Sequence, residues 1–241
     1  MIYSNIAKQH NNNSAERRFN RGYNIFYDAL LNHVTPKTFL ELGISKGNNL
    51  VLWSDILKDS VKIGVELLNP SQSVSSFIGD SSAMQLEEYK EAFTKAMQLE
   101  ECKEAFNKYL DYGSKHNNKW YFGWNAFAIE TVKEITNNHG KLDLIINDAK
   151  HGVKVWKMLD IWKDALTDNG IIITEEISCA TREQIPNGDL INDDQVNLAL
   201  EDGWEIYNFN TIRSWKQPNC LIGYWSKNKL NLEELDTYKY S

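Results

Sequence analysis

The stretch Phe39-Leu-Glu-Leu-Gly-Ile-Ser-Lys-Gly-Asn-Asn49 decides the fold, because a short apolar run ends there and breaks into two glycines before a helical pattern begins. This order predicts a strand, a tight turn and the start of a helix. Gly43 and Gly47 tolerate positive φ angles and carry no Cβ, so the backbone can lie directly against a ligand at the end of the strand. The stretch has neither the Gly-x-Gly-x-x-Gly pattern of dinucleotide-binding folds nor the Gly-Lys-Ser/Thr of a phosphate loop.

Apolar runs alternate with helical patterns along the rest of the chain. Repeated βα units predict an α/β fold, here a Rossmann-like, doubly wound and mostly parallel seven-stranded sheet with a C-terminal antiparallel hairpin. Ligands of such sheets bind at the carboxyl ends of the parallel strands. The predicted strands cover residues 39–42, 61–66, 120–124, 143–148, 171–176, 204–210 and 219–225.

The third strand has two candidates, residues 76–80 and residues 120–124. We favour the later run because it leaves a single long helix between the second and third strands and a normal connection to the fourth. Whether Asp80 or Asn125 follows the end of this strand stays open.

Between the fourth and fifth strands we expect one helix and then a tight turn. Asp168-Asn-Gly170 is the turn signal. The apolar residues of the helix recur at spacings of four, three and four, at Val155, Leu159, Trp162 and Leu166.

The chain is expected to hold one domain with appendages. Residues 1–16 are predicted to be a flexible N-terminal segment, residues 17–227 the domain, and residues 228–241 a polar C-terminal tail. Residues 83–108 contain two copies of a thirteen-residue segment that differ at only two positions. A solenoid needs at least three repeats, so we interpret this segment as a local duplication that lengthens one connecting helix.

Composition narrows the class of protein. The chain has 241 residues, 42% of them hydrophobic, and a net charge of −7, which disfavours nucleic acid as a partner. Three widely spaced cysteines and no histidine cluster suggest neither a disulfide framework nor a zinc site, as expected for a cytoplasmic protein. With no signal segment and no apolar run of eighteen residues, we expect no membrane association. The oligomeric state is left open, and a homo-oligomer is compatible with the sequence.

Polar residues follow the predicted strands at the edge where ligands bind. Glu66 ends the second strand about twenty residues after the glycine turn, where nucleotide-like ligands receive an acceptor for their ribose hydroxyls. Asp148, Glu175 and Glu176 should converge after the fourth and fifth strands, and crowded carboxylates favour a hard cation such as Mg²⁺. His151 lies one turn from Asp148 and could remove a proton from a substrate hydroxyl.

These motifs resemble those of class I S-adenosylmethionine-dependent methyltransferases. The resemblance is strongest to the metal-dependent group of macrocin and other sugar O-methyltransferases, which is grouped with cephalosporin-hydroxylase-type proteins. It extends from about residue 22 to residue 227, interrupted by the duplication. The segments that carry it are Leu40-Glu-Leu-Gly43, Gly47-Asn-Asn-Leu-Val-Leu-Trp53, Ile146-Asn-Asp-Ala-Lys-His151, Thr174-Glu-Glu176, Thr211-Ile-Arg213 and Pro218-Asn219.

The resemblance implies methyl transfer from S-adenosyl-L-methionine to a hydroxyl of a sugar or other small polar acceptor, that is, a small-molecule or glycan partner. By this similarity Asp148, Glu175 and Glu176 would bind a metal ion such as Mg²⁺, while His151, with Asp148, would serve catalysis. Cofactor-binding positions would be Glu41, Gly43, Gly47, Glu66, Asn125, Ala126 and Asp148.

Two departures from the group's pattern support a second hypothesis. Asn147 stands where the group has an acid, and Lys150 introduces an ammonium that could neutralise the nearby carboxylates. The alternative is therefore a non-catalytic S-adenosylmethionine-binding or assembly protein with a decayed acceptor site. An NAD-dependent dehydrogenase is disfavoured by the missing glycine fingerprint. A nucleic-acid methyltransferase is disfavoured by the charge and by the absence of an Asn/Asp-Pro-Pro-aromatic motif.

Overall fold

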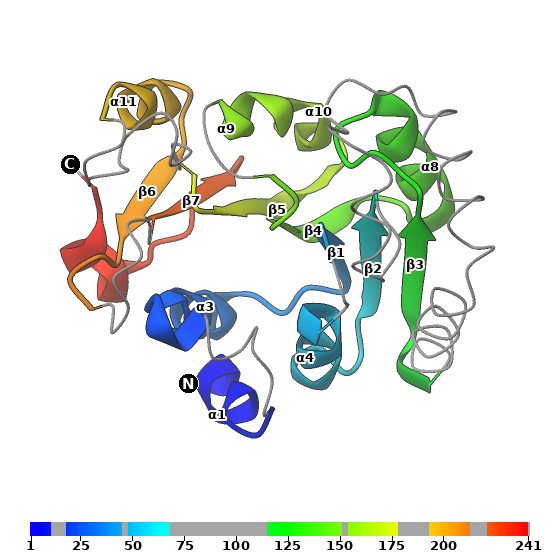
Figure 1. Cartoon of the computed structure of the whole chain (residues 1–241), viewed down its shortest axis with the longest axis horizontal. Helices are drawn as coiled ribbons and strands as arrows, with labels where there is room; N and C mark the ends of the chain where they lie inside the picture. The colour runs from blue at the N-terminus through cyan, green and yellow to red at the C-terminus, as the bar shows by residue number, and fades with distance from the viewer. Residues whose placement is uncertain are drawn as a thin grey trace, which may run out of the picture.

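The computed structural model describes residues 1–10, 18–44, 48–67, 115–150, 154–177, 193–212 and 221–240. Within these ranges helices and strands alternate along most of the chain (Figure 1). In order they are α1 (Ile2–Ala7), α3 (Tyr23–His33), β1 (Thr38–Leu42), α4 (Asn48–Ile56), β2 (Val61–Glu66), β3 (Asn118–Phe122), α8 (Ile129–His139), β4 (Leu142–Asn147), α9 (Val155–Met158), α10 (Asp160–Lys163), β5 (Leu166–Glu175), α11 (Asp193–Glu201), β6 (Glu205–Asn208), β7 (Leu221–Ser226) and the 3₁₀-helix η2 (Glu233–Tyr238).

The described strands form one sheet in the order β3-β2-β1-β4-β5-β7-β6. The pairs β3-β2, β2-β1, β1-β4 and β4-β5 are parallel, whereas β7 runs antiparallel to both β5 and β6. The strand order reverses between β1 and β4, which is the switch point where ligands of such sheets bind. The predicted fold class, a Rossmann-like and mostly parallel sheet with an antiparallel C-terminal hairpin, is therefore confirmed.

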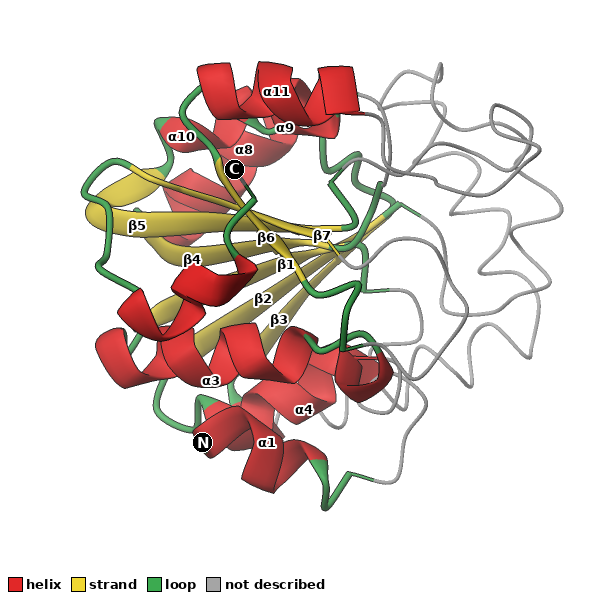
Figure 2. Cartoon of the chain, turned by 90° about the vertical axis from the view of Figure 1, so that its left-hand side faces the viewer, coloured by secondary structure: helices red, strands yellow, loops and turns green. Residues whose placement is uncertain are grey.

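Helices cover both faces of the sheet (Figure 2). The face with α1, α3 and α4 buries one hydrophobic cluster, which includes Phe39 and Ile146. The opposite face, covered by α8 to α11, buries a second cluster that includes Leu40 and Ile145. Because neighbouring strand residues point to opposite faces, both faces must be apolar, which explains the continuous apolar runs in the sequence.

The third strand is the later of the two candidates. β3 covers Asn118–Phe122 and pairs with β2 at the edge of the sheet, so Asn125 follows it. The strand ends two residues before the predicted limit because Gly123 takes a φ of +75°. Residues 76–80 and the duplication at residues 83–108 lie outside the described residues.

The connection between β4 and β5 differs from the prediction. Two short helices, α9 and α10, replace the single predicted helix, and Leu166 pairs with Leu142 as the first residue of β5. The predicted turn at residues 168–170 lies within this strand, next to a shift in register. A Cβ on Gly170 would lie 2.8 Å from the carbonyl oxygen of Leu142, so the glycine allows close strand pairing.

Both chain ends pack against the domain where the structure describes them. Residues 2–7, expected to be flexible, form α1, and Ser4 donates hydrogen bonds to the buried carboxylate of Asp28 on α3. In the segment expected to be a polar tail, Leu235 of η2 is fully buried and Lys239 forms a β-bridge with Tyr207. Buried hydrogen bonds thus hold the N-terminal end, and a buried leucine with a β-bridge holds the C-terminal end.

None of the described helices has the length and apolar character needed to cross a bilayer.

We predict that Tyr3 anchors α1. Its ring is fully buried, with ring centroids 5.0 Å from Tyr27 and 5.4 Å from Trp53. Tyr3→Ala should lower the free energy of unfolding by about 3 kcal/mol. Ile2→Ala, which changes an exposed neighbour on the same helix, should cost under about 0.5 kcal/mol. Equal losses for the two variants in urea denaturation would show that α1 contributes little to stability.

Candidate functional site

The turn after β1 lies against the turn after β4. Gly43, at a φ of +83°, donates its N–H to the carbonyl of Val65 at 2.8 Å, and the N–H of Asp148 donates to Leu42 at 2.9 Å. A Cβ on Gly43 would lie 2.2 Å from the Cα of Ala149. The protein's own backbone therefore requires this glycine, whereas the sequence had suggested close approach to a ligand. Gly47 lies outside the described residues.

The guanidinium of Arg18 lies among carboxylates from three strands. Its Nε donates to Oε1 of Glu175 at 2.6 Å, while its Nη2 lies 3.6 Å from Asp148 and 3.9 Å from Glu41. Burial alone would lower the pKa of Arg18, but the carboxylates, with Glu175 first, raise it well above its ordinary value. A buried and permanently charged group thus connects the ends of β1, β4 and β5.

Arg18 was missed by the sequence reading. The available signal was the basic cluster Arg17-Arg18-Phe-Asn-Arg21 just before an aromatic-rich helix. Sequence separation hides its role, because Arg18 and Glu175 are 157 positions apart.

Glu175 is held by a second donor. The hydroxyl of Tyr27, on α3, donates to the same Oε1 at 2.5 Å. Burial and the negative charge of Glu175 raise the pKa of Tyr27 well above its ordinary value, so the phenol keeps its proton. Glu175 is therefore fixed in orientation by one charged and one neutral donor.

The predicted metal ligands Asp148, Glu175 and Glu176 face cationic side chains in the described geometry. Within the described ranges no three His, Cys, Asp or Glu side chains are grouped so as to hold a metal ion. Arg18 faces Glu175 and Asp148, and Arg21 forms an ion pair with Glu176. These carboxylates already have fixed cationic partners, so the donor set does not fit a metal. His151 lies outside the described residues.

Glu41 is a buried carboxylate with unused acceptors. It is fully buried on β1, and neither oxygen accepts a hydrogen bond of ordinary geometry from a described residue, although the nearby side chain of Asn49 acts to lower the pKa of Glu41. Burial, partly opposed by Arg18, raises the pKa of Glu41 to about 8. Nη2 of Arg18, Oδ1 of Asn49 and the hydroxyl of Tyr3 likewise lack partners in the described part of the chain. Buried polar atoms are normally paired, so such a group indicates a bound water or ligand.

The remaining predicted cofactor residues lie along the same edge of the sheet. Glu66 ends β2, and its carbonyl accepts hydrogen bonds from Gly123 and Trp124, which fixes the turn after β3. Asn125 follows that turn, and its Oδ1 accepts a hydrogen bond from the N–H of Phe127 at 3.0 Å. The carbonyl of Ala126 accepts one from the indole of Trp162 at 2.8 Å. The carbonyl of Ala126 is thus already used within the protein. The NH₂ group of Asn125 can act as a hydrogen-bond donor.

The hydrogen bonds of Asn147 explain why an amide stands at this position. Its buried Nδ2 donates to Oγ1 of Thr174 at 2.8 Å and to the carbonyl of Lys150 at 2.9 Å, while its Oδ1 accepts from the N–H of Ala149. An ionised carboxylate could not donate either bond. Lys150 forms no ion pair with Asp148 or Glu176, all three being described residues. Among the described residues, Arg18 pairs with Asp148 and Arg21 with Glu176.

No family model and no curated protein sequence matches this chain. Several solved structures are similar to it at low identity. The SAH-bound methyltransferase PaMTH1 of Podospora anserina is 15% identical, with a TM-score of 0.46 over 94% of this chain and 86% of that chain. Fibrillarin of Aeropyrum pernix, with natively bound S-adenosyl-L-methionine, is 13% identical, with a TM-score of 0.44 over 83% and 73%.

A third structure is MycE, a methyltransferase of the mycinamycin biosynthetic pathway solved with Mg and SAH. It is 13% identical, with a TM-score of 0.38 over 67% of this chain and 34% of that chain. Because these TM-scores are all below 0.5, we assign the fold from this chain's own strand order and the function from its site.

We predict that Glu41 makes stability depend on pH. The unfolded chain loses this proton near the ordinary value of 4.5, whereas the folded protein keeps it up to about pH 8. Stability should therefore fall as pH rises between these values and level off above them. Glu41→Gln, which mimics the neutral acid, should remove this decline and raise the free energy of unfolding at pH 9 by about 2 kcal/mol or more.

Glu205→Gln is the control for urea denaturation across pH. Burial opposes the ionisation of Glu205, but hydrogen bonds from Lys239 and Lys229 lower its pKa overall. The ionised carboxylate of Glu205 stabilises the fold at high pH, and this stabilisation is lost as pH falls. Glu205→Gln should therefore be less stable than the native protein at high pH, the opposite of the result expected for Glu41→Gln. Identical pH profiles for Glu41→Gln and the native protein would contradict the assignment.

Proposed function

We propose that this chain is an S-adenosylmethionine-dependent O-methyltransferase that acts on a hydroxyl of a sugar or other small polar acceptor. The supporting observation is the pair formed by Arg18 and Glu41 at the switch point of the sheet. Both side chains are buried, Arg18 is cationic and Glu41 is an acid that can ionise, and their facing atoms at 3.9 Å do not hydrogen-bond to each other. Such a pair suits a ligand with one carboxylate and one ammonium group.

The amino-acid end of S-adenosylmethionine has these two groups. Nη2 of Arg18 would bind its carboxylate, and Glu41 would accept hydrogen bonds from its ammonium. The carboxylates of Asp148 and Glu175 lie in the same region, 3.6 Å and 2.6 Å from Arg18. The cofactor carries one net positive charge because its sulfonium adds to the ammonium. Charge complementarity of this kind favours the sulfonium form.

The nucleoside end would extend along the strand ends. The carboxylate of Glu66, at the end of the next strand, suits the ribose hydroxyls, as in other sheets of this order. The NH₂ of Asn125, whose oxygen already accepts a hydrogen bond, would donate to a ring nitrogen of the adenine.

The bound cofactor supplies an electrophilic methyl group. The chain's own residues would position the acceptor hydroxyl in line with it and remove its proton. His151, four residues after the end of β4, is our candidate for the base. Asp148, whose Oδ2 accepts a hydrogen bond from Asn49 at 3.2 Å, would orient the acceptor and favour the protonated imidazole.

The non-catalytic alternative is no longer favoured. It was motivated by Asn147 and Lys150, and neither residue indicates a decayed site. Asn147 is required as a hydrogen-bond donor between β4 and β5, and Lys150 does not neutralise the nearby acids.

Cofactor binding is predicted to depend on Glu41 and to release a proton. Titration calorimetry with S-adenosylmethionine should show about tenfold weaker binding for Glu41→Gln, because a neutral amide attracts the ammonium less. At pH 7 binding should release protons from Glu41, so the apparent enthalpy should vary with the ionisation enthalpy of the buffer. This variation should disappear in Glu41→Gln and persist in Glu205→Gln, which changes another buried acid. Native affinity in a folded Glu41→Gln protein would refute the assignment.

Transfer is predicted to depend on His151. His151→Ala should bind the cofactor with native affinity and transfer the labelled methyl group to sugar acceptors at least about 100-fold more slowly. Cofactor binding without transfer to any hydroxyl acceptor by the native protein would instead support the non-catalytic alternative.

A further inference from the structure

We infer that Arg18 occupies the position of a divalent cation among the carboxylates of Glu41, Asp148 and Glu175, so that the site works without a metal ion and would bind one only if Arg18 were removed. The part that concerns transfer rests on the proposed function. The part that concerns cation binding can be tested without cofactor or acceptor, so the two can fail separately.

The geometry supports this inference directly. One guanidinium has polar atoms 2.6 Å from Glu175, 3.6 Å from Asp148 and 3.9 Å from Glu41, which come from three neighbouring strands. A hard divalent ion would need several oxygen ligands at about 2.0–2.6 Å around one point. The guanidinium of Arg18 already lies within 4 Å of an oxygen of each of these three carboxylates.

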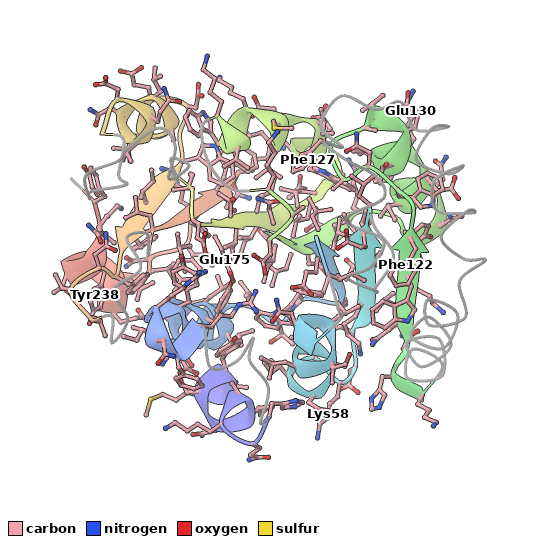
Figure 3. The ribbon with its side chains drawn as sticks, viewed as in Figure 1. Lys58, Phe122, Phe127, Glu130, Glu175 and Tyr238 are labelled. Atoms are coloured by element: carbon pink, nitrogen blue, oxygen red, sulfur yellow. The ribbon has the colours of Figure 1, made fainter. Side chains whose placement is uncertain are left out.

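One oxygen each of Glu175 and Asp148 that a metal could use already accepts hydrogen bonds, whereas Glu41 accepts none from the described residues. Oε1 of Glu175 accepts from both Arg18 and Tyr27, and Oδ2 of Asp148 accepts from Asn49 while facing Arg18. Figure 3 shows Glu175 directed from the sheet toward α3, the helix that carries Tyr27. A metal ion would have to displace these donors before it could coordinate the carboxylates.

Arg18 cannot easily leave. Only 3% of its surface is exposed, and a guanidinium does not lose its charge in proteins. A divalent ion beside it would meet a fixed like charge, and moving Arg18 away would leave its charge unpaired in the interior. The ion pair between Arg21 and Glu176 engages the last of the predicted metal ligands in the same way.

The experiment compares cation binding in native protein and in variants at Arg18, by thermal unfolding with and without millimolar Mg²⁺ and by Mn²⁺ titration followed by electron paramagnetic resonance. Native protein should show no cation-dependent stabilisation and no stoichiometric Mn²⁺ binding. Arg18→Met, which keeps the length and removes the charge, should gain both. The gain should be lost in Arg18→Met/Glu175→Gln.

Two controls separate charge from packing. Arg18→Lys keeps a cation at the site and should not gain cation binding. Lys62→Met removes a buried ammonium that lies 3.1 Å from the carbonyl of Leu57, so it should lose stability without gaining a cation site. Cation binding in Lys62→Met equal to that in Arg18→Met would overturn the inference.

If Arg18→Met does not fold with or without Mg²⁺, cation binding to the native protein tests the inference. Stoichiometric Mn²⁺ binding to the native protein that Glu175→Gln abolishes would overturn the inference, and its absence at millimolar Mn²⁺ would support it. For transfer, the native rate should be unchanged by a chelator, whereas a rate lost in chelator and restored by Mg²⁺ would contradict metal independence.

Discussion

The buried contact between Arg18 and Glu175 is the constraint on which the site depends. A guanidinium in a protein interior needs opposite charge nearby, and the carboxyl ends of β1, β4 and β5 provide it. The contact also fixes the segment before α3 against the sheet, since Tyr27 of that helix donates to the same carboxylate. The N-terminal region is therefore part of the site and does not merely precede the domain.

Much of the fold could be predicted because it is encoded locally. β2 has the predicted limits, residues 61–66, since β-branched residues bounded by a turn and an acid leave little ambiguity. The parallel order followed from repeated βα units, and the C-terminal strands from their alternation. The connection before β5 was predicted less well, because β5 begins at Leu166, before the turn signal Asp168-Asn-Gly170, which lies where the pairing with β4 shifts in register.

The site was harder to predict than the fold. Glu41, Gly43 and Asp148 could be placed at one edge from sequence, and the structure brings these three together. The sequence did not reveal that Arg18 is the cation beside these acids, because Arg18 and Glu175 are 157 positions apart. The packing of Tyr3 escaped notice for a related reason, since one turn of helix with a single large ring has no periodic signal.

The place of β7 in the sheet has a consequence for synthesis. It is the last described strand in the chain, yet it lies between β5 and β6 and pairs with both. On the ribosome, β5 and β6 therefore wait with open edges until residues 221–226 have left the exit tunnel. During that interval the exposed backbone of β5 is open to pairing with other chains. Late completion of the sheet thus leaves this edge of β5 unpaired until β7 is available.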